Sequence, residues 1–143
     1  MKLSGLTESE LVDAFKKKIR SILELAVPVW YGGLTQLQSN KIERIQKTAI
    51  AAILGQKYST YEHALTSLNL KSLSDRRTQI CSKFIEKNMK SEYPLLSKVQ
   101  KMHNTRSNAE LVEEVSCRTQ AFFDSSISFL ARLYNKNLKL KSK

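Results

Sequence analysis

The chain has 143 residues, of which 24 are Lys or Arg and 13 are Asp or Glu, so its formal net charge at pH 7 is +11. This length suits one domain with a buried core, and 4 Gly with 2 Pro are too few for a turn-rich sandwich or barrel. The excess of positive charge favours a polyanionic partner, first of all nucleic acid, with simple solubility as the alternative.

The spacing of apolar residues is helical rather than alternating, which predicts an all-α fold. We expect a small single-domain helical bundle of about five to six helices, with an irregular segment before the last helix. Residues 1–135 would form the helical module, and residues 136–143 would form a basic, frayed tail.

Several classes of protein and site are excluded by what the sequence lacks. No apolar run approaches the roughly 20 residues that span a bilayer, and nothing at the N-terminus resembles a signal peptide. Cys81 and Cys117 have no CxxC spacing, and His63 and His103 are isolated, which argues against a zinc or catalytic site. We expect no cofactor, no metal, no small-molecule substrate and no membrane partner. Two cysteines without such a pattern favour a reduced intracellular compartment, nucleus or cytoplasm, rather than secretion.

The first predicted helix begins at the capping box formed by Thr7 and Glu10 and ends near Ala26, because Pro28 follows. Its apolar stripe contains Leu11, Phe15, Ile19, Ile22, Leu23 and Ala26. Its polar face carries Lys16, Lys17, Arg20 and Glu24, while Lys18 falls within the apolar arc. Trp30 follows in the turn, where a core anchor is favoured over a base-stacking role.

The central predicted helix covers Leu34 to Gly55, with Thr35 and Gln38, or Ser39, supplying the N-cap and Gly55 ending the helix. Its inward side would consist of Leu34, Ile42, Ile45, Ala49, Ala52 and Ile53. We expect the part of this side formed by Ile45, Ala49 and Ile53 to be buried. The opposite side carries Lys41, Arg44 and Lys47.

Two further helices are predicted after Gly55. Ser59 with Glu62 would open a short helix through about Leu68, facing inward with Tyr61, Ala64, Leu65 and Leu68. Ser72 would open a long helix whose stripe contains Leu73, Ile80, Cys81, Phe84 and Ile85. Arg77 lies within that stripe, so we expect it to be a structural anchor paired with helix-terminal carbonyls or a carboxylate. Arg76 lies at the edge and is expected to face solvent or phosphate.

The last third of the chain has a weaker pattern. Tyr93-Pro94 would begin a short helix to about Lys101, and Met102 to Phe123 would be irregular, with extended structure around Val115 to Thr119. Asp124-Ser125-Ser126 offers an N-cap for a final helix through Asn135, whose stripe contains Ile127, Leu130, Ala131 and Tyr134.

Short segments in a fixed order resemble the C-terminal region of non-LTR (LINE-type) retrotransposon reverse transcriptases. They include Leu3-Ser4-Gly5-Leu6-Thr7, Ile19 to Glu24, Pro28-Val29-Trp30, Gly33-Leu34-Thr35, Glu43 to Lys47, Ile53-Leu54-Gly55, Asp75-Arg76-Arg77, Cys117-Arg118-Thr119 and Leu130 to Asn135. The resemblance extends over nearly the whole chain. It implies a thumb or post-thumb module that follows the polymerase palm domain in cis and helps to hold the template–primer duplex.

The chain has no Tyr/Phe-x-Asp-Asp motif, and Asp13, Asp75 and Asp124 are isolated, whereas a polymerase needs clustered carboxylates for its metal ions. We therefore expect no enzyme in this chain alone, although the resemblance implies a fragment of an RNA-directed DNA polymerase. An RNA–DNA or DNA duplex would be bound through its phosphates by Lys16, Lys17, Arg20, Lys41, Arg44, Lys47 and Arg76. The alternative is a structural or protein-interaction module without nucleic-acid binding. It would either dock on a polymerase palm or be a free-standing descendant.

Overall fold

The protein is mostly helical in the part that its structure, a computed structural model, describes: residues 5–90, 111, 112, 114 and 116–141. No strand occurs in these residues, and the predicted all-α class is confirmed. None of the helices within these ranges is both long enough and apolar enough to cross a bilayer. The short helix predicted from Tyr93 to Lys101 lies outside the described residues.

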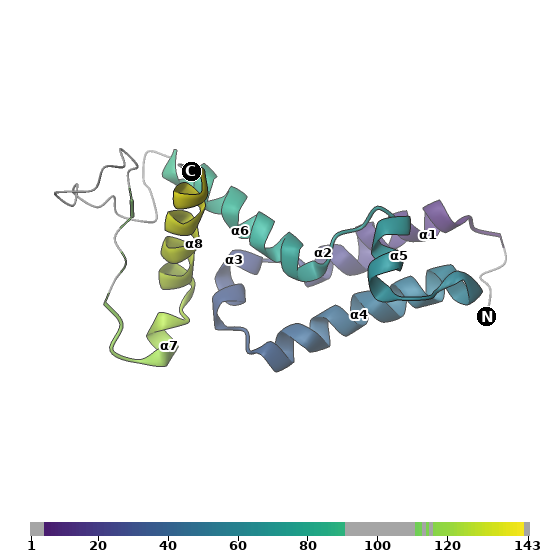
Figure 1. Cartoon of the computed structure of the whole chain (residues 1–143), viewed down its shortest axis with the longest axis horizontal. Coiled ribbons are helices and arrows are strands. Elements are labelled where there is room, and N and C mark those ends of the chain that lie inside the picture. Colours follow the sequence, from purple (N-terminus) through teal and green to yellow (C-terminus); the bar gives the residue numbers. More distant parts are fainter. Residues whose placement is uncertain (1–4, 91–110, 113, 115, 142–143) are drawn as a thin grey trace. The chain divides into compact units, whose positions relative to one another are not determined.

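The chain forms two compact units (Figure 1). Unit 1 consists of residues 1–25 and 35–76, and unit 2 consists of residues 26–34 and 77–143. The division falls inside helix α6 (Leu73–Met89), between Arg76 and Arg77. The sequence predicts a single module over residues 1–135, and this division of the chain stays a prediction.

The first helix of unit 1 changes its winding in the middle. It consists of α1 (Glu8–Ala14), the π-helical segment η1 (Phe15–Arg20) and α2 (Ser21–Leu23), and the predicted capping box at Thr7 and Glu10 is present. A π-helix bonds each N–H to the carbonyl five residues back, so the inward side drifts away from the period of about 3.6 residues assumed for the stripe. Phe15 is buried, but Ile19 and Ile22 are 42% and 73% exposed, which corrects the prediction for this stripe.

Helix α4 (Gln36–Leu54) begins at the predicted capping box of Thr35 and Gln38 and ends at Gly55, whose φ is 54°. The short 3₁₀ segment η3 (Gly55–Lys57) follows. The buried residues of α4 are Gln46, Ile50 and Leu54. Each follows directly after a residue that was predicted to be buried, namely Ile45, Ala49 and Ile53. Ile45 is instead 44% exposed. One residue is about 100° of helix rotation. The prediction was wrong because it counted only apolar residues, whereas Gln46 is buried with its amide donating two hydrogen bonds.

Helices α1 and α5 (Tyr61–Ser67) both pack against α4 in unit 1 (Figure 1). Thr60, rather than the predicted Ser59, caps α5, since its hydroxyl accepts a hydrogen bond from His63 N at 3.3 Å. The core of the unit contains Val12, Ile50, Leu54, Ala64 and Leu70. Ser72 caps α6 as predicted, accepting from Asp75 N at 3.0 Å.

Unit 2 contains α3 (Val27–Trp30), η2 (Tyr31–Gly33), the part of α6 from Arg77, α7 (Gln120–Phe123) and α8 (Ser126–Lys141). Its core is formed by Val27, Cys81, Ile85, Val112, Leu130 and Ala131. Helix α8 packs on α3 and η2, and Gly32 is necessary there because a Cβ would lie 2.7 Å from Phe129 Cβ. In the predicted stripe of α8, Leu130 and Ala131 are buried, but Ile127 is 51% exposed.

Two predictions for the C-terminal third need correction. The segment expected to be irregular up to Phe123 contains α7, which Thr119 caps by accepting from Phe122 N at 3.3 Å. Helix α8 continues to Lys141 instead of ending at Asn135. Asn135 is buried within the helix because its side-chain amide pairs with both the N–H and the carbonyl of Val112, at 2.8 and 2.9 Å.

Candidate functional site

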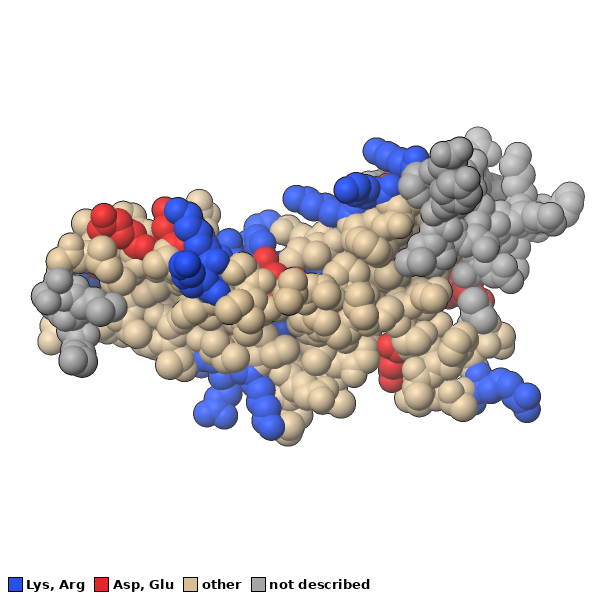
Figure 2. Space-filling model, turned by 180° about the vertical axis from the view of Figure 1, so that it is seen from behind, with Lys and Arg blue, Asp and Glu red and all other residues tan. Residues whose placement is uncertain are grey.

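On the face that Figure 2 shows, basic side chains stand in small groups, with a few acidic side chains and mostly uncharged surface around them. Each group must therefore be judged by the partners that its own members have. An Arg or Lys that is held by a carboxylate has less capacity to bind a phosphate than one that faces water alone.

The outward side of α4 carries Lys41, Arg44 and Lys47, which we call the basic face of α4. All three are exposed, and within the described residues no Asp or Glu forms an ion pair with any of them. The Lys47 ammonium lies 5.8 Å from the centroid of the Tyr61 ring, which leaves its charge uncompensated. Among the groups of residues predicted to contact phosphate, this face has the least positive charge offset by nearby carboxylates.

A polar network behind this face fixes how α4 is rotated. Glu43 turns inward, where its Oε1 accepts from Tyr61 Oη at 2.5 Å and from Leu73 N at 3.1 Å. Gln46 Nε2 donates to Tyr61 Oη and to the Lys71 carbonyl, both at 2.9 Å. Burial and the adjacent Glu43 raise the pKa of Tyr61, so the phenol remains a donor. These hydrogen bonds keep Glu43, the acidic residue of α4, away from the basic face of the same helix.

Two of the predicted phosphate-binding residues are instead held by Glu24. Arg76 forms a two-point contact with this carboxylate, with Nε bonded to Oε1 and Nη2 lying 2.7 Å from Oε2, and Arg20 Nε lies 3.6 Å from Oε1. Burial and the like charge of Arg76 lower the pKa of Arg20, whereas the bond to Glu24 raises the pKa of Arg76. Arg76 was expected to face solvent or phosphate, and this expectation was wrong. Its partner lies 52 residues earlier in the chain.

The remaining predicted cations lie on the first helix. Lys16 Nζ is 3.9 Å from Asp13 Oδ1, and Lys17 is exposed, as is Lys18. The structure thus divides the seven predicted residues into the basic face of α4, a cluster around Glu24 and a lysine pair on η1.

The three predicted structural anchors have separate surroundings. Trp30 is half-buried and packs against the core of unit 2. Arg77 is 1% exposed, and its guanidinium lies 5.3 Å from the centroid of the Tyr31 ring. Gly55 supplies the positive φ at which α4 ends, a conformation that costs glycine least.

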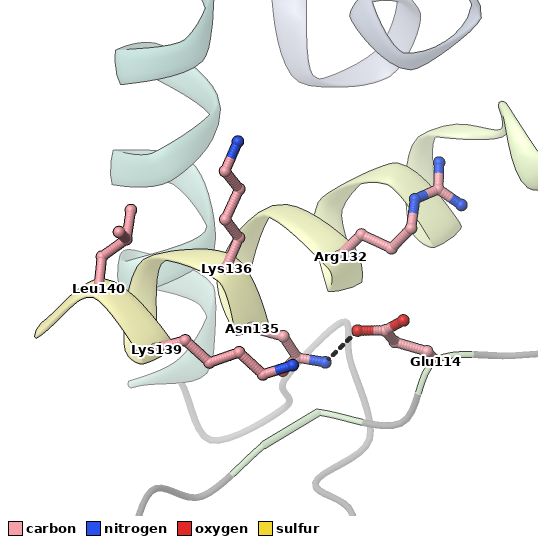
Figure 3. Close-up of a pocket in the computed structure, with 6 residues that line it drawn as sticks. All are labelled: Glu114, Arg132, Asn135, Lys136, Lys139 and Leu140. Carbon is pink, nitrogen blue, oxygen red and sulfur yellow. Dashed lines mark hydrogen bonds between the residues drawn. The ribbon is translucent and has the colours of Figure 1, made fainter. Parts of the chain in front are cut away.

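The corner between α7 and α8 is a feature that the sequence patterns did not predict. Phe122 and Phe123 are 47% and 43% exposed, and Arg132 Cζ lies 3.5 Å from the centroid of the Phe123 ring. An open groove lies along α8 next to this corner and is lined by Glu114, Arg132, Asn135, Lys136, Lys139 and Leu140 (Figure 3). The signal for the corner was an aromatic pair in a polar stretch, ten residues or fewer before an arginine.

The described part of the chain shows no cluster that could hold a metal ion, and the thiol of Cys81 is not suited to chemistry. No group of three or more His, Cys, Asp or Glu side chains there could hold a metal ion. Cys81 is fully buried, and burial raises the pKa of its thiol to about 11, which keeps it protonated and unreactive at neutral pH.

Comparisons of the chain with protein-family models, with curated proteins and with solved structures found no significant match.

Proposed function

We propose that this chain is a non-catalytic helical module that holds a nucleic-acid duplex through its phosphates, as the resemblance to the thumb and post-thumb region of non-LTR reverse transcriptases implies. The observation that carries the proposal is the basic face of α4, where three exposed cations have no acidic partner within the described residues. The net charge of +11 supports the same class of partner.

The spacing of the basic face of α4 suits a phosphate backbone. Lys41 and Lys47 are six residues apart, which is about 9 Å along a helix and comparable to about three nucleotide steps of 3.4 Å. Lysine and arginine on an exposed helix face reach phosphate oxygens without reading base edges. The binding is therefore expected to depend on shape and charge rather than on nucleotide sequence.

The proposal is tested by measuring affinity for an RNA–DNA duplex at several salt concentrations. The logarithm of the affinity should fall linearly with that of salt, with a slope of about −0.9 for each phosphate neutralised. Replacing Lys41, Arg44 and Lys47 by Ala should make the slope shallower by about two to three. A matched variant that replaces the exposed Lys83, Lys87 and Lys90 by Ala changes the net charge equally and should keep most of the slope. Equal, salt-independent binding by all three proteins would refute the proposal.

A second candidate, a docking module without nucleic-acid binding, is favoured by exposed apolar residues in the first helix and just after its end. Ile22 and Leu25 are 73% and 72% exposed, next to Ile19 at 42%. The resemblance names the partner as a polymerase palm domain in cis. If docking is the function, the isolated chain should self-associate in light scattering, and Ile22→Ser should reduce that association. A monomer with no association at any concentration would count against docking.

A further inference from the structure

Helix α7 ends in two exposed aromatic rings that are held in place. Phe122 N donates to the Thr119 hydroxyl at 3.3 Å, and Gln120 Nε2 donates to Asp124 Oδ2 at 2.9 Å, so both ends of this short helix are fixed by side chains. Phe122 and Phe123 are nevertheless 47% and 43% exposed. Neither ring belongs to the buried core of unit 2 or to the residues packed against it.

Arg132 of α8 holds the ring of Phe123. Its Cζ lies 3.5 Å from the ring centroid, and its Nη2 donates to the Phe123 carbonyl at 2.7 Å. These two contacts fix the orientation of the guanidinium against the ring. The guanidinium covers one face of the ring, so a stacking partner would have to use the opposite face, and Phe123 as a whole is 43% exposed.

Positive charge continues from this corner along α8. Arg132, Lys136 and Lys139 follow one another at spacings of four and three residues, which is about 10 Å of helix, and both lysines are exposed. Figure 3 shows the side chains of Arg132 and Lys136 turned away from Glu114, whereas that of Lys139 extends toward Asn135, whose Nδ2 donates to Glu114 Oε1 at 2.7 Å. A polyanionic chain complements this line of charge, whereas an apolar protein surface would leave the cations desolvated.

We propose that the corner between α7 and α8 stacks an unpaired nucleobase on the open face of Phe123, with the phosphates of the same strand along Arg132, Lys136 and Lys139. The guanidinium on one face and the base on the other would form a three-layer stack. A fixed aromatic ring beside a line of cations is the arrangement by which proteins bind single strands without reading their sequence.

This inference rests on the proposed function in one respect, namely that the partner is a nucleic acid. The basic face of α4 in unit 1 is assigned to paired backbone, and the corner in unit 2 is assigned to an unpaired base. The two assignments therefore fail separately, because blunt duplexes test the first and single strands test the second.

The test uses the full chain and three probes: a blunt RNA–DNA duplex, the same duplex with a single-stranded overhang, and an oligothymidylate strand. The overhang and the oligothymidylate strand each contain one 2-aminopurine, whose fluorescence falls when it stacks. The variant is Phe123→Leu, which keeps an apolar side chain, and the control is Phe84→Leu, which also removes a partly exposed ring from unit 2. Thermal melting confirms that each variant is folded.

The wild type should quench the fluorescence and bind the overhang duplex about five-fold or more tightly than the blunt duplex. Phe123→Leu should lose both effects and keep its affinity for the blunt duplex, and Phe84→Leu should behave as the wild type. If single-strand binding depends on Phe123, the result supports base stacking at the corner between α7 and α8, even if no blunt duplex binds. The inference is overturned if the wild type gives no quench, if folded Phe123→Leu retains it, or if this variant changes only self-association.

Discussion

The rotation of α4 decides which side chains face water, and two alanine variants measure it. Ile50 is fully buried and Ile45 is 44% exposed on the same helix. Truncating a buried Ile to Ala costs about 2–5 kcal/mol of unfolding free energy, through lost burial and the remaining cavity. At the half-exposed position we expect about 1 kcal/mol or less, because little apolar surface is lost to water.

Replacing Ile by Ala raises the helix propensity equally in both variants. The difference between their free energies of unfolding therefore reports the difference in burial. Urea unfolding followed by circular dichroism should show Ile50→Ala shifted to a lower midpoint by about 1 M or more, with Ile45→Ala close to the wild type. If Ile45→Ala were the more damaging change, α4 would have its inward side at Ile45, Ala49 and Ile53. The hydrogen bonds of Gln46 and Glu43 would then not exist, and the account of the basic face would fail.

Three further predictions concern packing, pH and thiol reactivity. Gly32→Ala should destabilise the protein by about 1–3 kcal/mol, since the added Cβ would lie 2.7 Å from a side-chain carbon of α8, and thermal melting would measure the loss. Hydrogen bonds from the Thr7 backbone and side chain lower the pKa of Glu10. The capping box should therefore stabilise the folded state fully above the usual pKa of Glu and lose this effect as pH falls through the lowered value. NMR titration of Glu10 should show a midpoint below that of a model peptide. Cys81, buried with a raised pKa of about 11, should react with a thiol reagent more slowly than the half-buried Cys117, as mass spectrometry can follow.

The starts of the first helix, α4 and α6 were predictable because an N-cap acts locally. Thr7 with Glu10, Thr35 with Gln38, and Ser72 all act within three residues of their own position, and each is found as predicted. The end of α4 was predictable for a similar reason, since glycine adopts a positive φ at little cost.

The buried faces were less predictable, because they depend on contacts between distant parts of the chain. The π-helical turns from Phe15 to Arg20 move Ile19 and Ile22 outward, and no period reveals such a segment in advance. Gln46 is buried because Tyr61 and the Lys71 carbonyl, 15 and 25 residues later, accept its hydrogen bonds. An apolar pattern cannot distinguish a polar residue that is buried through such hydrogen bonds from one on the surface.

The same limit applies to the candidate site. Helical spacing correctly places Lys41, Arg44 and Lys47 on an exposed side of α4. It could not show that Arg20 and Arg76 share Glu24, because this depends on how α6 approaches the first helix within unit 1. The stacking of Arg132 on Phe123 likewise depends on the tight turn between α7 and α8, which the weak pattern in this stretch did not predict.

The central claim is that the basic face of α4 contacts the phosphates of a duplex, and NMR of the ¹⁵N-labelled chain tests it most directly. Titration with an RNA–DNA duplex should shift the backbone amides of Lys41, Arg44 and Lys47, and the Arg44 Nε–H, at salt concentrations where binding occurs. The shifts should disappear together when salt is raised. Shifts confined to the exposed Ile19, Ile22 and Leu25, or no shifts on α4 despite measurable binding, would contradict the account.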